Sequence, residues 1–293
     1  NARAAFARTP REGPDGRGEE SHLCPPPSGE GGAMEQGLVS CEWLRDELAA
    51  GARDLRVVDA TWYLPNSPFA APEGSGGAAA DFDAGPRLPG AVFFDIDGVA
   101  TPHPAGLQHM LPNEETFSNA MMSLGVEPST RVVIYDRHGV FSSPRCWYTL
   151  KVAFRHPGDV AVLDGGLPRW RELGFPLDEE PQPSHKRQRV EPATAGATEA
   201  LWRRDPEASW TLEQVLSNID KRSALLVDAR SAGRFHGTAP EPRAGMRGGH
   251  VPGSASMPFT DLLTGPPGPM MMLPVADLEA KLRAAGVPVD EVR

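Results

Sequence analysis

Residues 55–60 read LRVVDA, and residues 225–229 read LLVDA. Each stretch is a short aliphatic run ending in aspartate and alanine, which is typical of a buried β-strand. Each also follows a predicted amphipathic helix, capped by Ser40 in the first case and by a Thr211–Gln214 capping box in the second. A helix followed by a strand ending in Val-Asp-Ala therefore occurs twice, and the chain contains an internal repeat.

The repeat continues beyond these strands in both halves. A Pro-Gly turn leads into a short apolar stretch at 88–94 (LPGAVFF) and again at 251–257 (VPGSASM). A Met-Leu-Pro sequence follows at 110–112 in the first half and at 272–274 in the second. Each precedes a predicted helix, and both helices end at Gly-Val. Strands that alternate with helices in both halves predict an α/β fold of two open domains with largely parallel sheets.

Only the first half continues past this point. It has a predicted strand and loop at 132–141, a helix with Ser143 as N-cap and Pro144 as its first residue, and a strand at 160–164. The second half reaches Arg293 before any counterpart of these elements. We therefore expect the second domain to be incomplete, with an unpaired strand edge, an open core and local disorder.

The expected domain organisation follows from this repeat and from composition. Residues 1–33 are crowded with Gly, Pro, Arg and Glu, which predicts a disordered tail, although their arginines leave an organellar transit peptide as an alternative. The first domain is expected at 34–180, a Pro-rich linker at 181–208 and the second domain at 209–293.

Charge and cysteine content argue against several classes of function. The chain has 293 residues with 29 Lys and Arg against 39 Asp and Glu, a net charge of −10, which speaks against binding to nucleic acid. Its apolar runs are shorter than the roughly 18 residues that span a bilayer. Cys24, Cys41 and Cys146 show no C-x-x-C spacing, so we expect an intracellular protein without disulfides or a metal site.

Three further stretches carry a family resemblance. They are LPGAVFFDID at 88–97, LDGGL at 163–167 and GHVPG at 249–253. Together with the two Val-Asp-Ala strands they make residues 38–293 similar to the tandem-domain rhodanese-type sulfurtransferases. The resemblance implies two rhodanese-like open parallel-sheet domains, the second of them incomplete in this chain.

Within that family the chain resembles the 3-mercaptopyruvate branch more than the thiosulfate branch. The residues that indicate this are GRF at 233–235 followed by EPR at 241–243. The resemblance implies a transferase that moves sulfane sulfur from 3-mercaptopyruvate or thiosulfate, through a cysteine persulfide, to a thiol or cyanide acceptor such as thioredoxin. It implies no cofactor, and a cytoplasmic or mitochondrial location.

The resemblance also assigns roles to the two domains. The first is expected to be catalytically silent, with Asp136 at the start of its loop, and the second carries the catalytic cysteine on the equivalent loop. That cysteine is expected beyond Arg293, so no catalytic residue is assigned within the chain. Cys146 is expected to be a small buried thiol. Cys41, in the first turn of a helix, either has a lowered pKa or serves packing alone.

Four residues are predicted to bind the substrate. Arg234 and Arg243 suit a carboxylate, because guanidinium groups bind it in a bidentate manner, and the resemblance brings Asp97 and His109 to the same cleft. Considered without the family, the arginines are solvated loop charges, Asp97 forms a turn and His109 begins a helix. The alternative function is a non-catalytic rhodanese-like module that binds a partner or a small anion.

Overall fold

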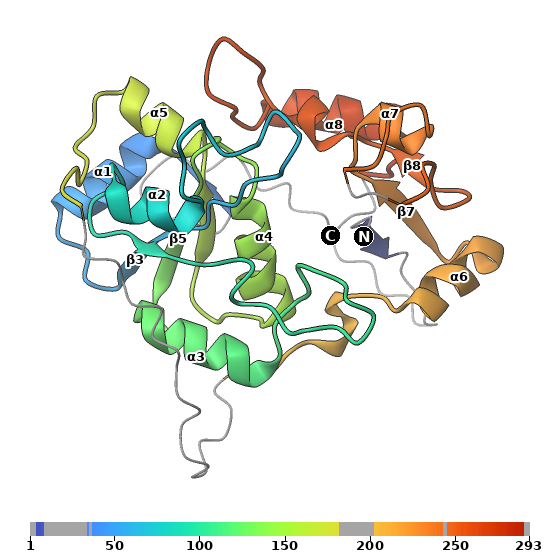
Figure 1. Ribbon diagram of the computed structural model, residues 1–293, viewed down its shortest axis with the longest axis horizontal. Coiled ribbons are helices and arrows are strands. Elements are labelled where there is room, and N and C mark those ends of the chain that lie inside the picture. The colour runs from blue at the N-terminus through green and yellow to red at the C-terminus, as the bar shows by residue number, and fades with distance from the viewer. Residues whose placement is uncertain (1–3, 9–33, 35–36, 182–201, 243–244, 290–293) are drawn as a thin grey trace, which may run out of the picture. The chain divides into compact units, whose positions relative to one another are not determined.

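The computed structural model describes residues 4–8, 34, 37–181, 202–242 and 245–289 (Figure 1). The chain divides into two compact units. The larger unit consists of Ala33–Ser209 together with Leu263–Met272, and the smaller unit contains Trp210–Leu262 and Leu273–Arg293 with the N-terminal residues. A ten-residue stretch of the second half thus belongs to the unit built by the first half.

The larger unit is built on a five-stranded sheet in which every pairing is parallel. Its strand order is β2-β6-β5-β3-β4. The strands are β2 (Leu38–Val39), β3 (Leu55–Asp59), β4 (Val92–Phe93), β5 (Arg131–Tyr135) and β6 (Val160–Leu163). Because β3 and β5 are central and parallel, Asp59 and Asp136 emerge at the same edge of the sheet.

Both faces of this sheet are buried, which explains why its strands are continuous apolar runs. Successive side chains point to opposite faces, so Val57 and Val133 pack in one hydrophobic cluster and Val58, Val132 and Ile134 in the other. Figure 1 shows α1, α2 and α5 on the first face and α3 and α4 on the second.

Helix boundaries follow local capping signals. The helices of the larger unit are α1 (Cys41–Ala49), α2 (Ala78–Ala84), α3 (Glu114–Leu124), α4 (Ser143–Trp147), which continues as a π-helical stretch over Tyr148–Ala153, and α5 (Gly166–Glu172). Ser40 caps α1 by accepting a hydrogen bond from the amide of Trp43, as predicted. The predicted cap of α4 is wrong by one residue, because Ser142 is the N-cap and the hydroxyl of Ser143 donates to Asp136 instead.

The smaller unit holds a three-stranded sheet of order β1-β7-β8. Its elements are β1 (Ala4–Arg8), α6 (Leu212–Lys221), β7 (Ala224–Asp228), α7 (Ala232–Phe235), β8 (Ala255–Ser256) and α8 (Val275–Ala284). The predicted capping box of Thr211 and Gln214 is present at the start of α6. β7 and β8 pair in parallel, as β3 and β4 do in the larger unit.

Strand β1 differs from the expectation for residues 1–33. It pairs antiparallel with β7 from Ala4 opposite Asp228 to Arg8 opposite Ala224. A strand added to a free sheet edge is held by backbone hydrogen bonds, which form whatever the side chains are. The amino-acid composition of residues 1–33 therefore does not predict this pairing. The unpaired edge expected on β7 is therefore covered in the structure, on the side where β3 pairs with β5 in the other sheet.

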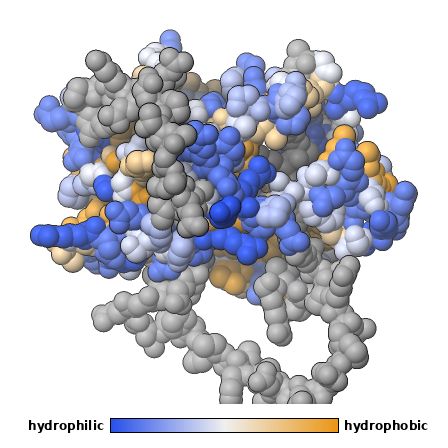
Figure 2. Space-filling model, turned by 90° about the horizontal axis from the view of Figure 1, so that it is seen from below, coloured by the Kyte–Doolittle hydropathy of each residue, from blue (hydrophilic) through white to orange (hydrophobic). Residues whose placement is uncertain are grey.

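The predicted α/β class is confirmed, with a fully parallel sheet in the larger unit and a small mixed sheet in the other. Figure 2 shows hydrophilic residues interspersed with smaller hydrophobic areas on the face that it presents. Within the described ranges, no helix combines the length and apolar character needed to cross a bilayer. The same ranges contain no group of three or more His, Cys, Asp or Glu side chains arranged to hold a metal ion.

Candidate functional site

The loop after β5 folds around the carboxylate of Asp136. One oxygen, Oδ1, accepts hydrogen bonds from the backbone amides of His138 (2.8 Å) and Gly139 (3.0 Å). The other, Oδ2, accepts from the amides of Phe141, Ser142 and Ser143, each at 2.9 Å, and from the Ser143 hydroxyl at 2.7 Å. Asp136 is fully buried. The carboxylate thus neutralises a cradle of six donors, at the sheet edge where α/β folds place their ligands.

This cradle is filled by the chain itself. Gly166, at the start of α5, approaches it so closely that a Cβ there would lie 2.4 Å from the carbonyl oxygen of Asp136. On its other side, a Cβ at Gly139 would lie 2.4 Å from the carbonyl oxygen of Met270. Since the donors already hold a carboxylate and glycines close the loop, the first half has an anion site with no vacancy for a substrate.

Asp97 and His109, two of the predicted site residues, lie together. Oδ1 of Asp97 is 2.5 Å from Nδ1 of His109, and its Oδ2 accepts a hydrogen bond from the indole of Trp62 at 2.9 Å. The Trp62 and His109 rings meet edge to face, with centroids 4.9 Å apart. Because both Asp97 oxygens are engaged, the carboxylate fixes the orientation of the imidazole and the indole together. Trp62 was not among the residues predicted from the sequence.

The backbone at His109 adopts a left-handed conformation. Its φ is +58°, which is uncommon for a residue other than glycine, asparagine or aspartate. Its carbonyl accepts a hydrogen bond from Nη2 of Arg145, on α4, at 2.9 Å. The imidazole is thus fixed from both ends, by Asp97 at the ring and by Arg145 at the backbone. A local conformation held in this way is typical of functional sites.

Arg234, in the smaller unit, is bound to Glu241. Its Nε and Nη2 donate to Oε2 of Glu241 at 3.1 and 2.5 Å. The other oxygen of Glu241 accepts from Nη1 of Arg230 at 2.9 Å. Arg230 in turn donates to both carboxylate oxygens of Asp228, at the end of β7. Arg234 was predicted from the sequence and these partners were not, although Glu241 belongs to the EPR sequence at 241–243.

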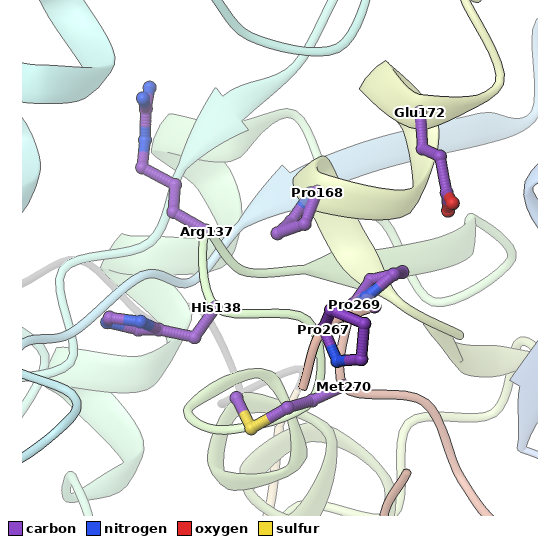
Figure 3. Close-up of a pocket in the computed structure, with 8 residues that line it drawn as sticks. Arg137, His138, Pro168, Glu172, Pro267, Pro269 and Met270 are labelled. Carbon is purple, nitrogen blue, oxygen red and sulfur yellow. The ribbon is translucent and has the colours of Figure 1, made fainter. Parts of the chain in front are cut away.

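Arg243, the fourth predicted residue, lies outside the described residues. A pocket of about 480 Å³ in the larger unit contains none of the predicted four. It is lined by Arg137 and His138 after β5, Pro168 and Glu172 of α5, and residues 267–270. Figure 3 shows the Arg137 and His138 side chains directed away from the prolines, and Nη2 of Arg137 donates to the Asp81 carbonyl. The pocket therefore lies between the loop after β5, helix α5 and residues 267–270.

Neither described cysteine is suited to nucleophilic chemistry. Cys146 is fully buried, and burial raises the pKa of its thiol well above the ordinary value. Burial also raises the pKa of Cys41 to about 12, so the alternative of a lowered pKa at the helix start is wrong. The expectation that Cys146 is a buried thiol is confirmed. Cys24 lies outside the described residues.

Comparison with known proteins identifies the family. A model of the rhodanese-like domain matches residues 40–173. The 3-mercaptopyruvate sulfurtransferase of Mus musculus is 40% identical over 231 residues, which are 78% of this chain and 70% of that protein. The chain belongs to the rhodanese-type sulfurtransferases. The mitochondrial thiosulfate/3-mercaptopyruvate sulfurtransferase 1 of Arabidopsis thaliana is 34% identical to this sulfurtransferase over 87% of the chain and 65% of its own length.

Solved structures agree with this assignment. SseA from Escherichia coli, described as a 3-mercaptopyruvate sulfotransferase with the rhodanese fold, superposes with a TM-score of 0.67 and 28% identity over 87% of this chain and 85% of its own. Tum1 from Saccharomyces cerevisiae gives a TM-score of 0.62 and 30% identity over 85% of this chain and 79% of its own. The rhodanese fold and the enzyme class predicted from the sequence are thereby confirmed.

Proposed function

We propose that this sulfurtransferase takes sulfur from 3-mercaptopyruvate and passes it through a cysteine persulfide to a thiol acceptor such as thioredoxin. The donor is a thiol with a planar carboxylate, which suits guanidinium groups. The observation that carries the proposal is the state of Arg234, whose Nε and Nη2 side is fixed by Glu241 while 26% of its side chain stays exposed. An arginine held in this way is ready to bind a carboxylate.

Sequence identity to the relatives does not by itself distinguish 3-mercaptopyruvate from thiosulfate as the sulfur donor. The thiosulfate sulfurtransferase of Cricetulus griseus is 38% identical over 79% of the chain, close to the 40% of the mouse 3-mercaptopyruvate enzyme. The choice rests on the second arginine, Arg243, in the EPR sequence. Arg234 and Arg243 together supply two planar donors for the carboxylate, and Asp97 with His109 supplies the remaining polar groups. We propose a cytosolic or mitochondrial location.

The proposed transfer breaks the C–S bond of the donor. A cysteine thiolate attacks the sulfur of 3-mercaptopyruvate, an S–S bond forms, and the donor's thiol proton ends on the methyl carbon of pyruvate. The products are pyruvate and the cysteine persulfide. Cys41 and Cys146 are buried with raised pKa values, so we propose neither as the nucleophile. We propose instead a cysteine on the loop of the second domain that is equivalent to the Asp136 loop, as the family resemblance implies.

The test is a donor comparison on the full-length protein. Pyruvate release from 3-mercaptopyruvate with dithiothreitol or thioredoxin as acceptor is measured beside thiocyanate formation from thiosulfate and cyanide. We expect a higher kcat/KM with 3-mercaptopyruvate, and a persulfide detected by mass spectrometry after donor alone. A higher kcat/KM with thiosulfate, or pyruvate release without any persulfide, contradicts the proposal.

Arg243→Ala provides a residue-level check of the same proposal. Loss of one guanidinium removes ground-state binding of the carboxylate, so KM for 3-mercaptopyruvate should rise about tenfold or more while the unfolding midpoint stays near that of the wild type. An unchanged KM would remove Arg243 from the site.

A further inference from the structure

The two halves end their equivalent strands differently. β3 ends in Val-Asp-Ala with Thr61 next, and Oδ1 of Asp59 accepts hydrogen bonds from the Thr61 amide (2.9 Å) and hydroxyl (2.5 Å). β7 ends in the same three residues, but Arg230 stands in the place of Thr61. Its guanidinium donates to both oxygens of Asp228 and to the carbonyl of Gly249. A neutral hydroxyl is therefore replaced by a charge.

The first half satisfies the equivalent aspartate in another way. Thr61 donates to Oδ1 of Asp59, and the charged partner of Asp59 is Arg137 from the loop after β5, whose Nε lies 3.6 Å from Oδ2. In the second half Arg230 connects Asp228 to further charged groups, because Arg230 also binds Glu241 and Glu241 binds Arg234. Asp228, Arg230 and Glu241 thus form a line of ion pairs that begins at the sheet and ends on the predicted substrate-binding arginine.

Glu241 is the central member of this line. Its side chain is only 5% exposed, and each of its oxygens is bound to a different arginine. The hydrogen bond and the charge of Arg234 hold the pKa of this carboxyl below its ordinary value, so the group stays ionised at neutral pH. The line contains two positive and two negative groups and is neutral as a whole.

The geometry leaves one edge of the Arg234 guanidinium for a ligand. Glu241 occupies the side edge, formed by Nε and Nη2. The end edge, formed by Nη1 and the second hydrogen of Nη2, has the spacing that a carboxylate needs for two parallel hydrogen bonds. Within the described parts of the chain, Nη1 makes no hydrogen bond. We propose that Glu241 is a positioning residue, which holds Arg234 so that its end edge receives the carboxylate of an α-keto acid donor.

The proposal rests on the proposed function, in which Arg234 binds the donor carboxylate. A free arginine side chain has many rotamers, and ordering it on binding weakens the affinity for the ligand. A guanidinium fixed beforehand avoids that loss. Glu241 acts on the binding of the donor and not on sulfur transfer, so its removal should change KM more than kcat.

The kinetic test compares three variants of the full-length protein. Glu241→Gln removes the charge at constant size, and we expect KM for 3-mercaptopyruvate to rise about tenfold with kcat within about twofold of wild type. Glu241→Asp restores the charge with a shorter reach and should recover part of the loss. Glu47→Gln is the matched control, because it also removes an arginine pair, 2.8 Å to Arg131 in the larger unit, and should leave KM unchanged.

A second measurement follows Arg234 itself and does not need turnover. The ¹H–¹⁵N signal of its Nε–H, assigned by its loss in Arg234→Lys, should exchange slowly with water in the wild type and rapidly in Glu241→Gln. Should Glu241→Gln fail to fold, the same signal in Glu241→Asp replaces it, with intermediate exchange expected.

The outcomes separate the two proposals. An unchanged Arg234 signal in Glu241→Gln, or a changed signal with an unchanged KM, overturns the positioning role. A wild-type protein that does not release pyruvate overturns the proposed function, and the Arg234 signal then still decides whether Glu241 holds the arginine.

Discussion

Asp136 shows how a single residue decides what a loop can do. Its carboxylate satisfies five backbone amides and one hydroxyl in a site that excludes water. A neutral side chain there leaves several buried donors poorly paired, and each such group costs about 1–3 kcal/mol. The loop therefore depends on an anion at its centre.

We predict that Asp136→Asn lowers the free energy of unfolding by about 3 kcal/mol or more, because asparagine offers one acceptor oxygen and brings an NH₂ group toward the remaining donors. The urea midpoint of the larger unit measures this. Asp54→Asn is the control, since Asp54 pairs with Arg131 at the surface, and its midpoint should shift much less. Equal shifts in the two variants would show that the cradle does not depend on the carboxylate.

His156 makes the stability of the larger unit sensitive to pH. It is 2% exposed, stacked on Trp202, and Nε2 lies 2.7 Å from the Thr130 carbonyl oxygen. Burial lowers its pKa below the ordinary 6.5, so the folded state binds its proton less readily than the unfolded chain. Stability from this residue is therefore complete above pH 6.5 and is lost as the pH falls from there through the lowered pKa.

Thermal unfolding between pH 7.5 and 5 tests this dependence. Tm of the wild type should decrease toward acid pH, and the decrease should be shallower in His156→Gln, which cannot take up a proton. His103→Gln alters an exposed histidine and should follow the wild-type slope. Parallel curves for all three proteins would assign the pH dependence to other groups.

At the scale of elements, the contact between α5 and the Asp136 loop depends on a glycine. Gly166 has φ of +50°, and a Cβ there would lie 2.4 Å from the Asp136 carbonyl oxygen and 2.7 Å from that of Gly139. Gly174, just after α5, has φ of +67° and open space around it. Comparing the two glycines therefore distinguishes the cost of a steric clash, present only at Gly166, from the strain of a left-handed backbone, present at both.

We predict that Gly174→Ala costs about 1–2 kcal/mol, the strain of a left-handed backbone alone, and that Gly166→Ala costs about 2 kcal/mol more, because the backbone of the loop must move. Urea unfolding of the two variants gives the difference directly. Similar urea midpoints for the two variants would mean that α5 and the Asp136 loop can move apart without a loss of stability.

The elements were largely predictable where their signals are local. Ser40 and the Thr211–Gln214 pair cap helices as expected, and apolar runs predicted β3, β5, β6 and β7. The prediction of Ser143 as an N-cap was wrong because its hydroxyl donates to Asp136. Helix-capping preferences consider only neighbouring residues and do not include this contact. Strand β1 and the Glu241 pairs with Arg230 and Arg234 were not foreseen for the same reason, since each joins residues whose meeting depends on the fold.

At the scale of the whole molecule, the two units bury their cores to different degrees. In the larger unit Val133, Ile134 and Tyr135 of β5 are completely buried beneath helices on both faces. In the described part of the smaller unit the buried hydrophobic residues are 4–8% exposed, and they are Leu226, Phe235, Met257 and Val287. Its helix α6 exposes 68% of Leu212 and 53% of Leu216. Local opening of the smaller unit should therefore require less free energy.

Hydrogen exchange of residues 1–293 tests this difference on equivalent strands. β3 and β7 occupy the same place in the repeat, and each pairs on both sides, β3 with β5 and β4 and β7 with β1 and β8. If hydrogen bonding alone set protection, their amides would exchange alike. Because the buried apolar surface differs, we expect the amides of 224–228 to exchange at least about a hundredfold faster than those of 55–59, which corresponds to about 3 kcal/mol. Equal protection of the two strands would instead mean that a few partly exposed residues stabilise the smaller sheet as well as two full clusters stabilise the larger one.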